Sequence, residues 1–212
     1  MKTEQSTYSY TRVNAGTATR KRGHNRVKSI VRTAKDIFLN DGYDNLKLQN
    51  IAATEGISLG NLTYYFKTKE HLFRTMIDEL LIQIGREIDK VLELYPDDPL
   101  LKFTKYIDVL IRDCKRYETR AFFYQIWSLS LHDEFVNDCR NDIYSSFTTI
   151  TKDLCRDLNP GLDERILNQR VFIFCSMIEG LHVMIGNYRR LPGYMRGFEK
   201  EFHNQALSLI TK

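Results

Sequence analysis

The chain has 212 residues, 42% of them hydrophobic and 27% charged, which is enough for one or two domains with a sizeable core. It has no apolar run long enough to cross a bilayer, and its polar first residues lack the apolar centre of a signal peptide. These features argue against a membrane protein and favour a cytoplasmic one. The net charge of +4 is uneven, with +7 in residues 1–75 and −3 in residues 76–212. A basic end suits DNA, although residues 1–28 alone carry +6.

Residues 1–24 are polar and basic without apolar periodicity, which predicts a flexible tail. Arg20, Lys21, Arg22 and Arg26 are candidates for contacts with phosphates or a minor groove, and a solvated tail without defined contacts is at least as good an interpretation. The apolar spacing in residues 26–39 then predicts the first helix.

Residues 47–66 read as two short helices joined by a glycine turn. Gly56 follows the first helical pattern, where a left-handed residue ends a helix at low cost. Ser58 is placed to cap the next helix, predicted over residues 58–65. That helix has few apolar anchors and many hydrogen-bonding groups, among them Asn61, Thr63 and Tyr64. Such a helix is better suited to a major groove than to complete burial.

This segment resembles the DNA-binding part of the tetracycline-repressor (TetR) family of bacterial transcription regulators. The resemblance covers residues 26–75, about a quarter of the chain, and its specificity lies in the whole pattern. The matching residues are Ala34, Phe38, Gly42, Tyr43, Ile51, Ala52, Gly56, Ser58, Gly60, Leu62, Tyr65, Phe66, Lys69, Glu70 and Leu72.

The resemblance implies a set of residues that contact a double-stranded DNA operator. They are Lys47, Ser58, Leu59, Gly60, Asn61, Thr63, Tyr64, Tyr65 and Lys69. Two positions depart from the family pattern. Lys47 stands where members usually have a capping Ser or Thr, so the helix loses a cap worth about 1 kcal/mol and gains a cation. Thr63 stands where members usually have a tyrosine that contacts a phosphate.

The rest of the chain also predicts helices and no strand, over residues 69–94, 100–116, 120–132, 134–158, 164–190 and 195–210. The expected fold is all-α, with a three-helix helix-turn-helix head before a helical bundle. We predict a basic tail in residues 1–24, a DNA-binding domain in residues 25–72, and an effector-binding and dimerisation domain in residues 73–212.

The sequence contains no P-loop, G-x-G-x-x-G, H-E-x-x-H or G-x-S-x-G pattern, so we expect neither an enzyme nor a bound cofactor. The four cysteines are widely spaced, which predicts reduced, mostly buried thiols. His132, Asp133 and Glu134 suggest a metal site only weakly, because consecutive residues point in different directions. A solvated helix start explains them better.

Aromatic residues at helical spacing around Trp127 have two interpretations. They are packed core, as is usual, or they line an effector cavity, as the resemblance implies. If they line a cavity, the effector is mainly hydrophobic. The candidate wall residues are Tyr106, Leu110, Phe123, Tyr124, Trp127, Phe147, Phe174 and Ile178.

The predicted helix over residues 164–190 is apolar nearly all round in its middle, which indicates burial. The resemblance implies that this helix and the last helix pair across a two-fold axis with the same two helices of a second copy, forming a four-helix bundle. The candidate interface residues are Met177, Leu181, Met184 and Ile185. Glu179 and His182 lie one turn apart in this run, where they bind a polar ligand group or form structural hydrogen bonds.

The expected function is a homodimeric transcription regulator, a repressor released from a palindromic operator by a small-molecule effector. The alternative is an architectural or division-linked DNA-binding protein with the same head and no effector. An enzyme built on a helical bundle is the least favoured interpretation.

Overall fold

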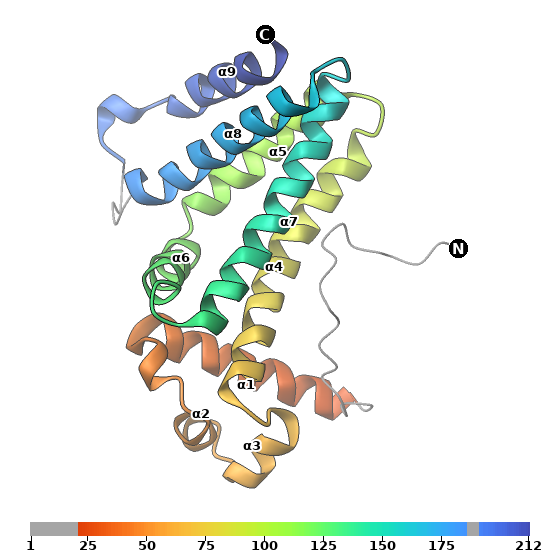
Figure 1. Cartoon of the computed structure of the whole chain (residues 1–212). Helices are drawn as coiled ribbons and strands as arrows, with labels where there is room; N and C mark the ends of the chain where they lie inside the picture. Colours follow the sequence, from red (N-terminus) through yellow and green to blue (C-terminus); the bar gives the residue numbers. More distant parts are fainter. Residues whose placement is uncertain (1–20, 186–190) are drawn as a thin grey trace. The chain divides into compact units, whose positions relative to one another are not determined.

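The structure, a computed structural model, describes residues 21–185 and 191–212. Over these residues it contains nine α-helices and two short 3₁₀ turns, Tyr43–Asn45 and Gly193–Met195, and no strand (Figure 1). The all-α fold class is therefore confirmed. The helices are α1 (Lys21–Asp41), α2 (Leu48–Thr54), α3 (Leu59–Tyr65), α4 (Lys69–Leu94), α5 (Pro99–Cys114), α6 (Tyr117–Leu129), α7 (Glu134–Leu158), α8 (Glu164–Ile185) and α9 (Phe198–Thr211).

Most helix limits agree with the sequence analysis, and three differ. Helix α1 begins at Lys21, so residues 21–24, which we expected in the tail, are helical. Helix α6 is shifted by three residues towards the amino terminus. Helix α9 begins at Phe198 because Gly197, with φ of +83°, adopts a left-handed conformation directly before it. The predicted tail residues before Lys21 and the predicted helical residues 186–190 lie outside the described part of the chain.

The described residues form two compact units. The head unit contains residues 21–83 and Tyr124–Arg140, and the other, which we call the carboxy-terminal unit, contains Ile84–Phe123 and Asn141–Lys212. Helices α4, α6 and α7 therefore contribute residues to both units. The units are defined by compactness and divide these three helices, so the functional boundary that we predicted between residues 72 and 73 stays a prediction.

The core of the head unit is built on aromatic rings. The Phe73 ring lies edge-on to Phe38 and Tyr43, with centroid distances of 5.3 and 5.0 Å. Phe135, at the start of α7, lies 6.2 Å from Phe73. From α6, Gln125 Nε2 donates a hydrogen bond of 2.7 Å to Phe38 O near the end of α1. The turn of α6 and α7 thus completes the packing of the helix-turn-helix head.

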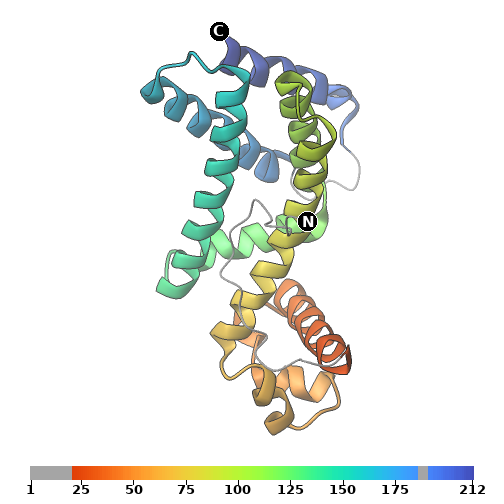
Figure 2. The same cartoon turned by 90° about the vertical axis from the view of Figure 1, so that its right-hand side faces the viewer.

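In the carboxy-terminal unit, α5 and α9 pack against α8 and against each other (Figure 1; Figure 2 shows the same helices from the side). Phe103 and Phe174 lie at the centre, with ring centroids 5.4 Å apart. The buried Tyr106 hydroxyl is satisfied by Thr151 Oγ1 at 2.7 Å, as a polar group in a core requires. At the far end, Asn159 and Arg170 donate to Ile210 O and satisfy a terminal carbonyl of α9.

The four cysteines, Cys114, Cys139, Cys155 and Cys175, are buried thiols that are not joined in disulfides, as expected. His132–Glu134 do not gather metal ligands, and Asp133 instead accepts from Val136 N at 3.0 Å and caps α7. Among the described residues, no group of three or more His, Cys, Asp or Glu side chains is placed to hold a metal ion. No helix in the described ranges has the length and apolar character needed to span a membrane.

Candidate nucleic-acid interface

The turn between α2 and α3 has the geometry that its glycine and serine predict. Gly56 has φ of +64°, where a side chain would strain the backbone, and its N–H bonds to Ala53 O at 3.2 Å. Ser58 then caps α3, because its Oγ accepts a hydrogen bond of 3.1 Å from Asn61 N. Both features arise from neighbouring residues, so they were visible in the sequence.

Helix α3 has one buried face and one exposed face. Leu62 and the following Phe66 are 0% and 1% exposed, and they anchor the helix in the head core. Asn61 and Tyr64 are exposed, Tyr64 at 61%. A helix held on one side and polar on the other can enter a major groove, where base edges present donors and acceptors.

The other predicted contact residues of α3 lie beside this exposed face. Ser58, Leu59 and Gly60 are exposed at the amino-terminal end, where the backbone N–H groups favour an anion. Thr63 and Tyr65 are half-buried. Thr63 Oγ1 is turned back onto its own helix, to Gly60 O at 3.2 Å.

Lys69 is engaged within the head unit. Its Nζ donates a hydrogen bond of 2.7 Å to Tyr43 O and lies 3.3 Å from the centroid of the Tyr43 ring. Burial lowers the pKa of Lys69, and the nearby carboxylates of Asp44 and Glu70 oppose this shift. The ammonium group has three donors, so Tyr43 O leaves others for a further partner.

Lys47, by contrast, is exposed at the start of α2, where the structure shows no side-chain cap. A cation at this place has no intramolecular role in the described structure, which suits a phosphate contact. Of the basic tail residues, Arg20 lies outside the described residues. Arg26 is half-buried and its Nη1 lies 3.4 Å from Glu55 Oε2.

Glu55, which the sequence analysis did not single out, joins α2 to α1. Its carboxylate accepts hydrogen bonds from Ser29 and Thr33 on α1, besides the ion pair with Arg26. Burial alone would raise its pKa, but the hydrogen bonds and the Arg26 charge outweigh burial and lower it. These contacts fix α2, and through the glycine turn α3, on the first helix. One glutamate in a helical pattern gives no sequence signal for such a role.

The predicted effector-binding residues belong to two units and differ in burial. Five of them are buried and three are half-buried, and Tyr124 and Trp127 belong to the head unit whereas the other six belong to the carboxy-terminal unit. The buried members are Tyr106, Leu110, Phe123, Phe174 and Ile178, and the half-buried ones are Tyr124, Trp127 and Phe147. Their rings pack against neighbouring side chains, for example Phe123 against His182 at 4.9 Å. Such ring packing agrees with the core interpretation, and the cavity interpretation stays a prediction.

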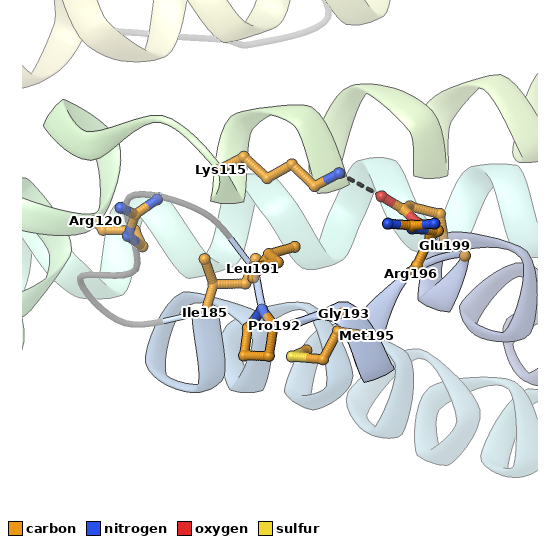
Figure 3. Close-up of a pocket in the computed structure, with 10 residues that line it drawn as sticks. Lys115, Arg120, Ile185, Leu191, Pro192, Gly193, Met195, Arg196 and Glu199 are labelled. Carbon is orange, nitrogen blue, oxygen red and sulfur yellow. Dashed lines mark hydrogen bonds and ion pairs between the residues drawn. The ribbon is translucent and has the colours of Figure 1, made fainter.

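A cavity of about 740 Å³ lies elsewhere in the carboxy-terminal unit (Figure 3). Its walls come from the ends of α5 and α8, the start of α6, the 3₁₀ turn and the start of α9. None of the eight predicted residues lines it. The lining residues are Lys115, Arg120, Ile185, Leu191, Pro192, Gly193, Met195, Arg196, Gly197 and Glu199.

The predicted dimer residues occupy different faces of α8. Met184 is 69% exposed, while Met177 and Leu181 are half-buried. Ile185 is only 2% exposed and points into its own unit, so it is not available to a partner as we expected. Periodicity alone cannot assign the faces of a helix that is apolar nearly all round.

Comparison with known proteins places the helix-turn-helix segment in a family. The sequence profile of "Bacterial regulatory proteins, tetR family" matches residues 30–76. The HTH-type transcriptional regulator RutR of Escherichia coli is 37% identical over 54 residues, which cover 26% of each chain. The match thus spans about a quarter of the length of this curated relative.

Solved structures are similar over most of the chain. A proposed TetR-family transcriptional regulator from Rhodococcus has a TM-score of 0.66 at 14% identity, covering 88% of this chain and 97% of that one. A proposed transcriptional regulator from Saccharomonospora viridis, solved in complex with choline, has a TM-score of 0.63 at 17% identity, covering 85% and 96%. At these identities the likeness shows the fold. Residues 30–76 therefore match the DNA-binding segment of the TetR family of bacterial regulatory proteins, and over most of its length the chain has the fold of these solved structures.

Proposed function

We propose that the protein is a homodimeric transcription regulator that reads a palindromic operator with α3, acts as a repressor, and is released by a small-molecule effector. The observation that carries this proposal is the pair of faces on α3. Leu62 and Phe66 hold the helix in the head, and Asn61 and Tyr64 stay exposed. Exposed hydrogen-bonding groups on an anchored helix are what direct readout of bases requires.

Within this proposal some contact residues read bases and others bind phosphates. Asn61 forms hydrogen bonds with a base edge, and Leu59 packs on a thymine methyl group. Lys47, Tyr65 and the amino-terminal end of α3 contact phosphates, which position the head without reading sequence. Lys69 also contacts a phosphate, with the N–H donors of its ammonium group that are not bonded to Tyr43 O. Its contact with Tyr43 orients the ammonium group at the start of α4.

The dimer is supported by the outward face of α8. Phe172, Ile173, Val183 and Met184 are exposed, at 47–71%, in a helix whose other side forms the core. A contiguous apolar face of this kind marks an interaction surface, and a second copy brings two recognition helices to half-sites one helical turn apart, about 34–36 Å, or a multiple of it.

An effector releases DNA only if it binds the free arrangement of the heads more tightly than the DNA-bound one. A ligand site in the carboxy-terminal unit is supported by the cavity of about 740 Å³. The choline complex of the similar Saccharomonospora viridis protein supports ligand binding in this fold.

Genome-wide footprinting of the full-length protein on the DNA of its source organism tests the proposal. We expect a few palindromic sites, each occupied less selectively when Asn61 is replaced by alanine. Many dispersed sites without a common palindrome would favour the architectural alternative. No protected DNA at all, with a folded protein, would refute both.

A further inference from the structure

Arg120, at the start of α6, is a buried cation without a buried counter-charge. The residue is 5% exposed, and its Nη1 donates a hydrogen bond of 3.0 Å to Cys114 O. Its Nε is completely buried and has no hydrogen-bond partner. In the described residues, no carboxylate lies within ion-pair distance of Arg120.

This arrangement is costly in the ligand-free protein. A guanidinium group stays charged at all relevant pH values, and burying a charge without a partner costs several kcal/mol. The nearby buried acids are occupied elsewhere, since Asp113 bonds to Thr119 and Arg116 and Glu179 accepts from Tyr144. A fold that retains such a group without an internal counter-charge has a place for an external anion.

The surroundings of Arg120 match this requirement, because it lines the cavity of about 740 Å³. Figure 3 shows Arg120 at one end and Arg196 with the Lys115–Glu199 ion pair at the other, with Ile185 and Pro192 between them. Three cationic side chains and one carboxylate give the lining a net positive charge. The apolar residues supply a wall for a hydrocarbon body.

We propose that this cavity binds a small organic acid, with its carboxylate on Arg120 and its apolar body on the wall formed by Ile185, Leu191, Pro192 and Met195. The volume lies within the range of small-molecule sites. Arginine suits this task because its planar fork of donors matches a carboxylate. The claim that the acid acts as the effector rests on the proposed function. The claim that the acid binds in this cavity does not depend on it.

This proposal changes the expected effector. The aromatic residues around Trp127 predicted a mainly hydrophobic molecule, but none of them lines this cavity. The cavity has apolar walls and a buried cation. The expected effector therefore still has an apolar body, and it also carries an oxyanion group that neutralises Arg120.

The first test needs no ligand. Arg120→Met removes the buried charge and keeps the side-chain length, so the ligand-free full-length variant should melt at a higher temperature than the wild type. Arg112→Met, which removes an exposed arginine of α5, is the matched control and should change little. A lower melting temperature for Arg120→Met alone would mean that Arg120 is structural, and would overturn the proposal.

The second test measures binding by calorimetry in the absence of DNA. The probes are aromatic and aliphatic carboxylates from benzoate to octanoate, their neutral amides, inorganic phosphate, and choline. We expect carboxylates to bind better than their amides, and Arg120→Met to weaken them about 10- to 100-fold. Phosphate binding as tightly as every carboxylate would mean that a simple oxyanion occupies the site and no apolar body is recognised. Equal binding of acids and amides, no binding, or tighter binding of choline would refute the proposal.

A third measurement separates the two proposals. Operator binding is followed with and without the best carboxylate. A carboxylate that binds through Arg120 but leaves the protein–DNA complex intact supports the cavity assignment and contradicts release by this ligand. Carboxylate binding by a protein that recognises no operator would refute only the proposed regulator.

Discussion

Helices α3 and α8 each bury one face and expose the other, but what they expose is different. Helix α3 presents Asn61 and Tyr64, whose polar groups are well solvated before any partner arrives. Helix α8 presents Phe172 at 71% exposure and Met184 at 69%, which water solvates poorly. The first surface suits a hydrated, charged partner such as DNA, and the second suits another apolar surface.

The difference also bears on how closely the partners approach. Along the exposed side of α8, Ser176 is exposed and Gly180 is half-buried, and a Cβ added at Gly180 would meet nothing within 4 Å in its own chain. Small residues among large apolar ones permit close packing of a second helix. Along α3, the exposed side chains of Asn61 and Tyr64 are polar and uncharged, so its contacts in a groove depend on base sequence, while the salt dependence of binding comes from nearby cations such as Lys47.

The largest effect is expected from a charge on the outward face of α8. In a dimer, Met184→Arg buries an unpaired cation, which costs about 3–5 kcal/mol of association free energy. Sedimentation at micromolar concentration should show monomers, with loss of tight operator binding. Ser145→Arg, at an exposed position of α7, is the control and should remain dimeric. If the Met184→Arg protein stays a dimer, this face is not the interface.

The inward faces of the two helices differ as well, because only α8 carries buried titratable groups. Burial raises the pKa of Glu179 from 4.5 to about 7, although the hydrogen bond from Tyr144 opposes it. Burial, and then the charge of Arg120, lower the pKa of His182 to about 4, so this ring is neutral at pH 7. His182 Nδ1 and Glu179 Oε2 are 3.7 Å apart, too far for a strong hydrogen bond to reverse either shift.

For Glu179 the folded state holds its proton more tightly than the unfolded state. Its contribution to stability is therefore present below pH 4.5 and is lost as the pH rises through about 7. Relative to Glu179→Gln, the wild type should lose about 3 kcal/mol of unfolding free energy across this window. Urea unfolding of both proteins at several pH values measures the difference. The unfolding free energy of Glu118→Gln, a change at an exposed position, should vary with pH in the same way as that of the wild type. If Glu179→Gln also follows the wild type, the raised pKa of Glu179 is contradicted.

A smaller effect is expected on the exposed face of α3. Asn61→Ala should leave the melting temperature nearly unchanged and reduce discrimination between operator bases by about 1–3 kcal/mol. Its buried neighbour gives the matched contrast, since Leu62→Ala should cost stability without changing base preference in the folded fraction. Competition binding with operator variants checks this. An unaltered preference in Asn61→Ala would remove Asn61 from the readout.

The smallest effect concerns a phosphate contact. Lys47→Ala should weaken binding to all sequences alike and lower the slope of log K against log salt by about one. Lys69→Ala should do the same if its free donors reach a phosphate, but it also breaks the contact with Tyr43 and should lower thermal stability. Titrations at several salt concentrations distinguish the two lysines. If neither variant changes the salt slope, the proposed contacts of Lys47 and Lys69 with phosphates are excluded.

Short-range features could be predicted without a structure because neighbouring residues produce them. The glycine turn, the Ser58 cap and the break before α5, where Asp98 accepts from Leu101 N, depend on local backbone geometry. The helices themselves follow from apolar spacing. These elements were sufficient to identify the helix-turn-helix and its exposed recognition helix.

Three features of the sites could not be predicted in this way. Ile185 and Met184 are adjacent in an apolar run, yet only tertiary packing turned one inward and the other outward. The aromatic residues around Trp127 had the spacing of a pocket wall or a core, and spacing alone gave no sign that the cavity of about 740 Å³ is lined by other residues. Arg120 had no sequence signal, because an arginine in a helix is usually solvated.

By itself, the sequence determined the order of the helices, the chemistry of the recognition helix and its attachment through Leu62 and Phe66. These depend on residues within a few positions of one another, whose geometry the backbone imposes. The tertiary structure alone decided that Lys69 rests on Tyr43, that Glu55 joins α2 to α1, and that Arg120 is buried beside a cavity. Those partners are distant along the chain, and burial, which sets the strength of their charges, exists only after the helices have packed.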